Sequence, residues 1–221
     1  MKKLLLIFCI TMLSSIFVTA QTTDDFHKGE FSVGFSNNQV DTGISDDNED
    51  LRDFFRDREG FNGVEVSGVG NLNRYVGLKG DFSVHVKDFD FDVPRVGTTP
   101  ATRFEVDASL YNFLGGVQVK DNSKEGSRFR PFGHALAGVA HRRTKLDNEF
   151  FTSAFCQQIG VNCRQDFNES ETGFAAAIGG GLDIKATERF SVRAFQVDYN
   201  PTRFGGSIQN NFRFGVGIVI H

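Results

Sequence analysis

The chain contains no tryptophan, only 4 prolines and only 3 cysteines among its 221 residues. Without tryptophan it lacks the Gly-x-Trp start of lipocalins, and any aromatic girdle must be built from its 25 phenylalanines. Apart from the N-terminus, no uninterrupted apolar run approaches the roughly 20 residues that a transmembrane helix needs. A helical membrane protein is therefore excluded. A membrane β-barrel is not, because its strands are short and only half apolar.

The N-terminus has the three-part pattern of a secretory signal peptide. Two lysines precede an apolar core, Leu4–Val18, and small residues up to Ala20 offer a cleavage site. We therefore predict a signal peptide over residues 1–20 and an exported mature domain over residues 21–221. Removal of the two lysines takes the formal net charge from −4 to −6. This mildly acidic balance argues against nucleic acid as a partner.

Two cysteines remain in the mature chain, Cys156 and Cys163. In an oxidising compartment we expect them to form a disulfide across their short loop, contributing about 2–3 kcal/mol at most. Neither histidine nor a further cysteine lies near them in the sequence, so they do not form a metal site. We expect no metal and no cofactor.

What the sequence does contain is strict alternation of apolar and polar residues. The clearest example is Val76–Asp88, VGLKGDFSVHVKD, in which Phe82 and Val84 share one face and Lys79 and Asp81 the other. Successive side chains of a strand point to opposite faces, so this period of two predicts β-strands. Eight segments carry it: Glu30–Asn37, Phe61–Leu72, Val76–Asp88, Thr102–Val119, Arg130–Arg142, Gly173–Lys185, Phe190–Tyr199 and Phe212–Ile220.

Three of these segments depart from a simple alternation. The phase slips near Gly115-Gly116 and again within Phe190–Tyr199, and each slip suggests a β-bulge. The phase of Arg130–Arg142 is left open by its sequence.

The connections between the segments alternate in length. Three are long, two are moderate and two are tight, and the long ones fall on one end of an antiparallel meander: Asn38–Gly60, Phe89–Ala101 and Arg143–Thr172. Long extracellular loops and short periplasmic turns are typical of outer-membrane barrels. The moderate connections are Lys120–Phe129 and Asn200–Asn211. We predict an all-β fold, an eight-stranded antiparallel up-and-down transmembrane barrel.

The alternation by itself also fits a soluble periplasmic ligand-binding barrel, whose apolar face would be a core. Three features favour the membrane: the export signal, the alternation of loop lengths, and the strand lengths. The segments run beyond the ~5–6 residues of a typical soluble strand. A membrane strand needs ~9–11 residues.

Several local motifs accompany this pattern: Tyr111–Gly116, Arg130–Ala135, Gly179–Asp183 and Asp198–Phe204. With them, the mature chain from about Glu30 resembles the small outer-membrane β-barrel family of the OmpA/OmpX type. The resemblance implies a barrel in the outer membrane, with outer-membrane lipid and the barrel-insertion machinery as partners. Such barrels usually close on an aromatic residue, whereas this sequence ends with Ile220-His221.

The polar faces of the predicted strands carry charged residues that we place in the lumen: Glu65, Lys79, Asp81, His85, Lys87, Glu105, Asp107, Asp183, Lys185, Arg193 and Arg213. An eight-stranded barrel is just wide enough for side chains to fill. Unpaired buried charges are costly, so we expect these groups to pair into a plug. The alternative is a very narrow pore, gated by rearrangement of the pairs.

Two other classes of function stay open. A lipid A-modifying hydrolase or acyltransferase would need a nucleophile and a histidine near the outer rim, and Ser83 lies two residues from His85. The sequence has no GxSxG, and we predict no catalytic residue. The long loops offer an extracellular contact surface, with phenylalanines in Arg143–Thr172 and eight acids in Asn38–Gly60 that could bind divalent cations weakly.

Overall fold

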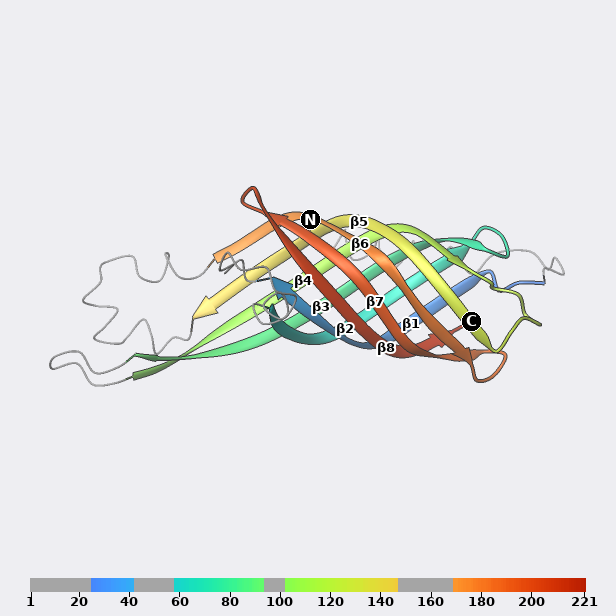
Figure 1. Ribbon diagram of the computed structural model, residues 1–221, viewed down its shortest axis with the longest axis horizontal. Helices are drawn as coiled ribbons and strands as arrows, with labels where there is room; N and C mark the ends of the chain where they lie inside the picture. The colour runs from blue at the N-terminus through green and yellow to red at the C-terminus, as the bar shows by residue number, and fades with distance from the viewer. Residues whose placement is uncertain (1–24, 42–57, 94–101, 147–168) are drawn as a thin grey trace, which may run out of the picture.

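The computed structural model describes residues 25–41, 58–93, 102–146 and 169–221 (Figure 1). The predicted signal peptide, the Cys156–Cys163 disulfide and most of the acidic loop lie outside these ranges. Within them the chain forms eight strands: β1 (Gly29–Asp41), β2 (Arg58–Asn71), β3 (Val76–Val93), β4 (Thr102–Lys120), β5 (Phe129–Leu146), β6 (Glu169–Lys185), β7 (Phe190–Phe204) and β8 (Ser207–Ile220).

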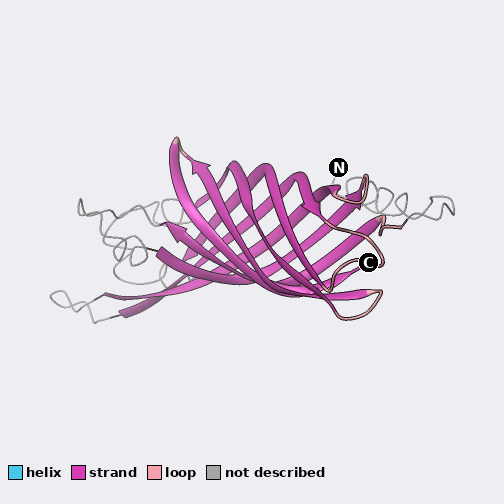
Figure 2. Cartoon of the chain, turned by 45° about the vertical axis from the view of Figure 1, so that its right-hand side comes forward, coloured by secondary structure: helices cyan, strands magenta, loops and turns pink. Residues whose placement is uncertain are grey.

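The strands form one closed barrel. Each pairs antiparallel with its neighbour in sequence, and β8 returns to pair with β1, which leaves no open edge along the ring. Figure 2 shows the steep tilt of the strands about the barrel axis. No helix in the described part of the chain is long and apolar enough to cross a membrane. The predicted fold class and the number of strands are confirmed.

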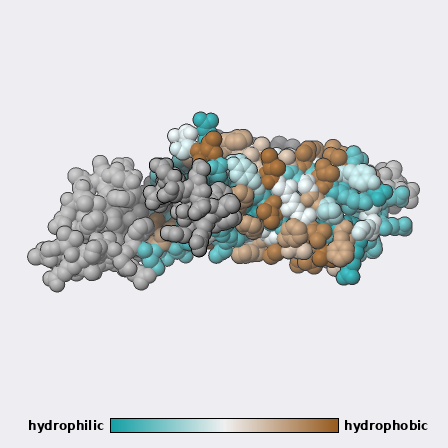
Figure 3. Space-filling model, in the orientation of Figure 1, coloured by the Kyte–Doolittle hydropathy of each residue, from teal (hydrophilic) through white to brown (hydrophobic). Residues whose placement is uncertain are grey.

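The barrel is apolar outside and polar inside. Large apolar side chains lie about half exposed on every wall, among them Phe35, Phe113 and Ile218, and Figure 3 shows apolar side chains gathered on the outside of the barrel. Charged and amide side chains such as Arg213 and Asn112 are completely buried in the lumen. A soluble barrel would show the reverse, because apolar surface is stable only out of water. This arrangement, apolar outside and polar inside, is that of a transmembrane barrel.

The two predicted bulges have different outcomes. In β7 the pairing with β8 shifts between Arg193 and Gln196, so the expected irregularity is present. In β4 the pairing with β3 and β5 is uninterrupted, and the bulge predicted at Gly115-Gly116 is wrong. The apparent slip arises because Leu110 and Leu114 are buried inside the barrel, where polar residues were expected.

The fifth strand, β5, places its even-numbered residues inside. Arg130, Phe132, His134 and Leu136 are buried, whereas Phe129 lies exposed on the outer wall. This settles the phase that the sequence left open. It also gives the lumen a histidine and two large apolar side chains.

The two ends of the barrel differ. At one end, the short-turn end, the connections after β2, β4 and β6 are short, and β1 begins and β8 ends there. The other end, the long-loop end, holds the connections 42–57, 94–101 and 147–168. Between β7 and β8 the moderate loop predicted over Asn200–Asn211 is wrong, because pairing continues to Phe204 and Ser207. Gly205 and Gly206 make this tight turn with φ of 54° and 92°, a conformation that favours glycine.

Candidate functional site

The middle of the lumen is organised around the guanidinium of Arg213. Its Nη1 donates to Asp81 Oδ1 at 2.7 Å and its Nη2 to Asp198 Oδ2 at 2.7 Å, and Nε lies 3.5 Å from Glu65 Oε2. The side chain of Arg213 has no exposed surface. Its three carboxylate partners come from β3, β7 and β2, so the contacts of Arg213 cross the barrel from β8 to other walls.

Lys79 and His134 complete this layer. Lys79 Nζ lies 3.4 Å from Asp81 Oδ2 and 3.4 Å from His134 Nδ1, and His134 Nε2 lies 2.9 Å from Asp198 Oδ1. The imidazole of His134 therefore lies between the ammonium of Lys79 and the carboxylate of Asp198. His134 thereby connects β5 to the groups contributed by β3 and β7.

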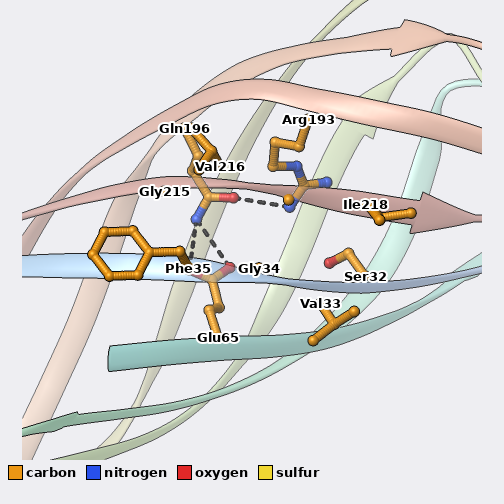
Figure 4. A pocket seen from close by; sticks show the side chains of 11 residues that line it. Ser32, Val33, Gly34, Phe35, Glu65, Arg193, Gln196, Gly215, Val216 and Ile218 are labelled. Atoms are coloured by element: carbon orange, nitrogen blue, oxygen red, sulfur yellow. Dashed lines mark hydrogen bonds between the residues drawn. The ribbon is translucent and has the colours of Figure 1, made fainter. Parts of the chain in front are cut away.

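Gln196 connects this layer to the next. Its amide nitrogen donates to Glu65 Oε1 at 3.0 Å, and its amide oxygen accepts from Arg193 Nη1 at 2.9 Å (Figure 4). The amide nitrogen also donates to Asp198 Oδ2 at 2.8 Å. Beside these groups the lumen holds a cavity of about 10 Å³, next to Gly34, among other residues. A cavity of this size has room for about one water molecule.

A second layer lies toward the short-turn end. Arg193 Nε donates to Asp183 Oδ1 at 2.9 Å, and Lys120 Nζ contacts Asp183 Oδ2 at 3.0 Å and Glu30 Oε2 at 2.5 Å. We call the two layers together the lumen charge network: Glu30, Glu65, Lys79, Asp81, Lys120, His134, Asp183, Arg193, Gln196, Asp198 and Arg213.

The structure brings together six of the residues that the sequence placed in the lumen: Glu65, Lys79, Asp81, Asp183, Arg193 and Arg213. Three others lie apart from the lumen charge network. His85 is buried and forms a 2.9 Å hydrogen bond with Ser36 Oγ. Lys87 pairs with Glu59 at 2.6 Å at the long-loop end. Lys185 pairs with Glu188 at 2.8 Å at the short-turn end.

The prediction for Glu105 and Asp107 is wrong, because both are exposed on the outer wall. They lie on the odd-numbered face of β4, which points outward from Glu105 to Val119. Together with Asp88 they form a group of carboxylates whose ligand atoms lie within 4.8 Å of one another. Asp88 and Asp107 are direct cross-strand partners. At this exposed position, water and salt screen the repulsion between them.

The predicted set of lumen charges does not include five members of the lumen charge network: Glu30, Lys120, His134, Gln196 and Asp198. Two of them had a readable signal. Glu30 shares its phase with the polar residues of β1, and Asp198 lies between the outward-facing Val197 and Tyr199. Lys120 was assigned to the connection after the fourth segment, and His134 lies in the segment whose phase was left open.

Exposed ion pairs hold the short turns outside the membrane-spanning part. Arg74 donates from Nε and Nη2 to the two carboxylate oxygens of Asp121, both at 2.9 Å. These hydrogen bonds hold the pKa of the Asp121 carboxyl well below its usual range. At the β6–β7 turn, the hydrogen bond from Lys185 lowers the pKa of Glu188.

The serine and histidine considered for lipid chemistry face inward. Ser83 and His85 have no exposed surface, so neither reaches the lipid around the barrel. Ser83 Oγ accepts from Asn112 Nδ2 at 3.3 Å and from Arg213 Nη1 at 3.3 Å. His141 lies on the outer wall and forms a 2.8 Å hydrogen bond with Thr172 Oγ1.

Solved structures share this fold. The attachment invasion locus protein Ail of Yersinia pestis, solved in complex with the heparin analogue sucrose octasulfate, is 17% identical over 87% of this chain and 99% of that chain, with a TM-score of 0.50. Neisserial surface protein A is 9% identical over 88% of this chain and 97% of that chain, with a TM-score of 0.51. At these identities the likeness shows the fold alone. No curated protein sequence matches the chain significantly.

The family model described as "Outer membrane protein beta-barrel domain" matches residues 8–219, almost the whole chain. This match agrees with the closed ring of eight strands, the apolar outer wall and the polar lumen. The chain therefore belongs to the outer membrane protein beta-barrel domain family.

Proposed function

We propose that the protein is a closed, non-enzymatic barrel of the outer membrane, with a structural role in the envelope and a contact surface at its long-loop end. One observation carries the proposal: Arg213, with no exposed surface, is bound by carboxylates from three other strands across the lumen. Moving one of these charges aside would leave another unpaired in a region of low dielectric, which is costly. The network is therefore a stable plug.

Export and insertion are part of this proposal. Residues 1–20 act as the signal peptide, the outer wall contacts outer-membrane lipid, and the barrel-insertion machinery assembles the chain. The half-exposed apolar side chains on all walls support the lipid contact. With this orientation the short-turn end faces the periplasm and the long-loop end faces outward.

The contact surface is supported by the uneven height of the barrel wall. Pairing of β2 with β3 stops at Asn62 and Val86, whereas pairing of β3 with β4 continues to Val93 and Thr102. Strands β3 and β4 therefore extend beyond their neighbours at the long-loop end (Figure 1). An extended hairpin above the lipid is placed to meet a partner outside the cell.

Planar-bilayer recording tests the plug. We expect purified wild-type protein to insert without discrete conductance steps. Regular steps from the wild type would contradict the plug and favour the very narrow pore. Outer-membrane fractionation with heat-modifiable gel mobility tests the location, and a periplasmic protein without a mobility shift would overturn it. The enzymatic alternative predicts a mass change in lipid A on expression, and we expect none.

A further inference from the structure

The long-loop end of the lumen contains a second, larger cavity of about 340 Å³. It lies above the lumen charge network, between the upper parts of β1, β2, β3, β4, β5 and β8. Its apolar lining consists of Val40, Phe61, Phe89, Val106, Ala108 and Leu110. A cavity of this volume falls at the lower end of the range of small-molecule sites in proteins.

The apolar lining does not belong to the lipid-facing wall. Leu110 is only 4% exposed and belongs to a buried cluster inside the barrel that includes Leu114, Leu136 and Phe204. This apolar wall contrasts with the lumen charge network, which fills the part of the lumen toward the short-turn end. Water in contact with such a wall is unfavourable, so an apolar occupant would be stabilised there.

The charged side chains around the cavity already have partners. Glu59 is paired with Lys87 at 2.6 Å, and Arg142 Nη2 lies 3.3 Å from Glu171 Oε2. Asp41 accepts a hydrogen bond from the backbone N–H of Asn210 at 3.3 Å. A charged ligand would have to compete with these contacts, whereas a neutral ligand would leave them intact.

The polar lining that remains is uncharged. Thr144 brings a hydroxyl group to the cavity, and Gln209 brings an amide whose oxygen accepts from Thr202 Oγ1 at 3.4 Å. Such groups can orient a ligand that carries a single hydroxyl or carbonyl. The lumen charge network closes the barrel beneath, so the cavity is a blind pocket.

We infer that this pocket binds a neutral, mainly apolar small molecule with one hydrogen-bonding group, taken up at the long-loop end. The occupant is apolar because of Phe61, Val106 and Leu110, and neutral because the charges at the rim are paired. This function is independent of the plug. A barrel that conducts ions could still bind the ligand, and a closed barrel could fail to bind it.

Methyl NMR tests the inference directly. The full barrel, labelled at alanine, leucine and valine methyls in detergent micelles, is titrated with 1-naphthol as the probe. We expect saturable shifts at Val40, Ala108 and Leu110, while the outward-facing Val139 changes only in proportion to probe concentration. Ala108→Phe fills the pocket and should weaken the saturable binding at least tenfold. Val106→Phe is the second filling variant if the first does not fold.

Ala137→Phe is the matched control, because Ala137 is exposed on the outer wall of β5. It should bind the probe as the wild type does. Naphthalene-1-sulfonate, which adds a negative charge to the same ring system, should bind at least tenfold more weakly than 1-naphthol. Equal affinity for the two probes, unsaturated shifts, or unchanged binding in both filling variants would overturn the inference. So would Overhauser contacts showing another part of the chain in the pocket.

Discussion

Asp198 and Arg213 are direct cross-strand partners on β7 and β8, and their side chains meet inside the barrel. Asp198 Oδ2 accepts from Arg213 Nη2 at 2.7 Å and from Arg213 Nε at 3.0 Å. The other oxygen of Asp198 lies 2.9 Å from His134 Nε2. One carboxylate thus joins β5, β7 and β8 across the lumen, and its position depends on the shift in β7 that brings it to the inner face.

Asp198→Asn should destabilise the barrel strongly. The substitution keeps the size of the side chain but removes one of the two charges that lie 2.7 Å from Arg213. Breaking a buried pair typically costs about 3–5 kcal/mol. We expect the free energy of unfolding to fall by about 3 kcal/mol, near the lower end of this range, since Asp81 and Glu65 still contact Arg213. Urea unfolding in detergent, followed by gel mobility, measures it. Asp107→Asn on the exposed outer wall is the control, and an equal effect of both variants would contradict the assignment.

The sequence predicted the strands that build the barrel better than it predicted which residues belong to the lumen charge network. Strict alternation in β3 identified Lys79 and Asp81, because a polar residue between lipid-facing neighbours has only the lumen left. Alternation assigns the wrong face where side chains in the lumen are apolar. In β4, Leu110 has the alternation of a lipid-facing residue although it is buried in the lumen, so Glu105 and Asp107 were placed inside. Lys120 was assigned to the connection that follows. Pairing across the barrel, which decides these cases, is not encoded in local periodicity.

Gly179→Ala should also destabilise the barrel. Gly179 faces the lumen, and a methyl group there would collide with the carboxylate of Asp198 and the backbone carbonyl of Val197. The backbone carbonyl cannot move aside without disturbing the strand pairing. We therefore expect the free energy of unfolding to fall by about 1–3 kcal/mol, as at other overpacked sites. Gly68→Ala is the matched control, since its added methyl has no neighbour within 4 Å. Similar unfolding midpoints for the two variants would contradict this prediction.

A lysine on the outer wall should reveal the depth of the membrane. Val216 and Ile208 both lie exposed on the outer face of β8, but Ile208 is near the tight turn at the long-loop end. Val216→Lys should cost about 2–4 kcal/mol if it lies near the bilayer midplane, and Ile208→Lys about 0–1 kcal/mol near the interface. Unfolding in lipid vesicles measures both. Equal costs would mean that the bilayer does not cover β8 as proposed.

The segment Asp25–Lys28 should detach from the short-turn end as the pH falls. Its contacts include a 3.0 Å hydrogen bond from the His27 N–H to the Asn122 carbonyl, and the His27 ring stacks on His221 with centroids 4.6 Å apart. Burial, together with the nearby His221 and Arg130, lowers the pKa of His27 from 6.5 to about 4. Between these two values the detached histidine binds a proton that the docked one does not.

Docking is therefore fully stable above about pH 6.5 and weakens progressively as the pH falls toward 4. Amide exchange of His27, corrected for the intrinsic rate at each pH, should show protection at pH 7 that decreases by pH 5. His27→Gln cannot bind the proton and should show equal protection at both values. A wild type whose protection is the same at pH 7 and pH 5 would rule out His27 as the titrating group. In that case the imidazole would bind a proton equally well docked and detached, and the stability of docking would not depend on pH.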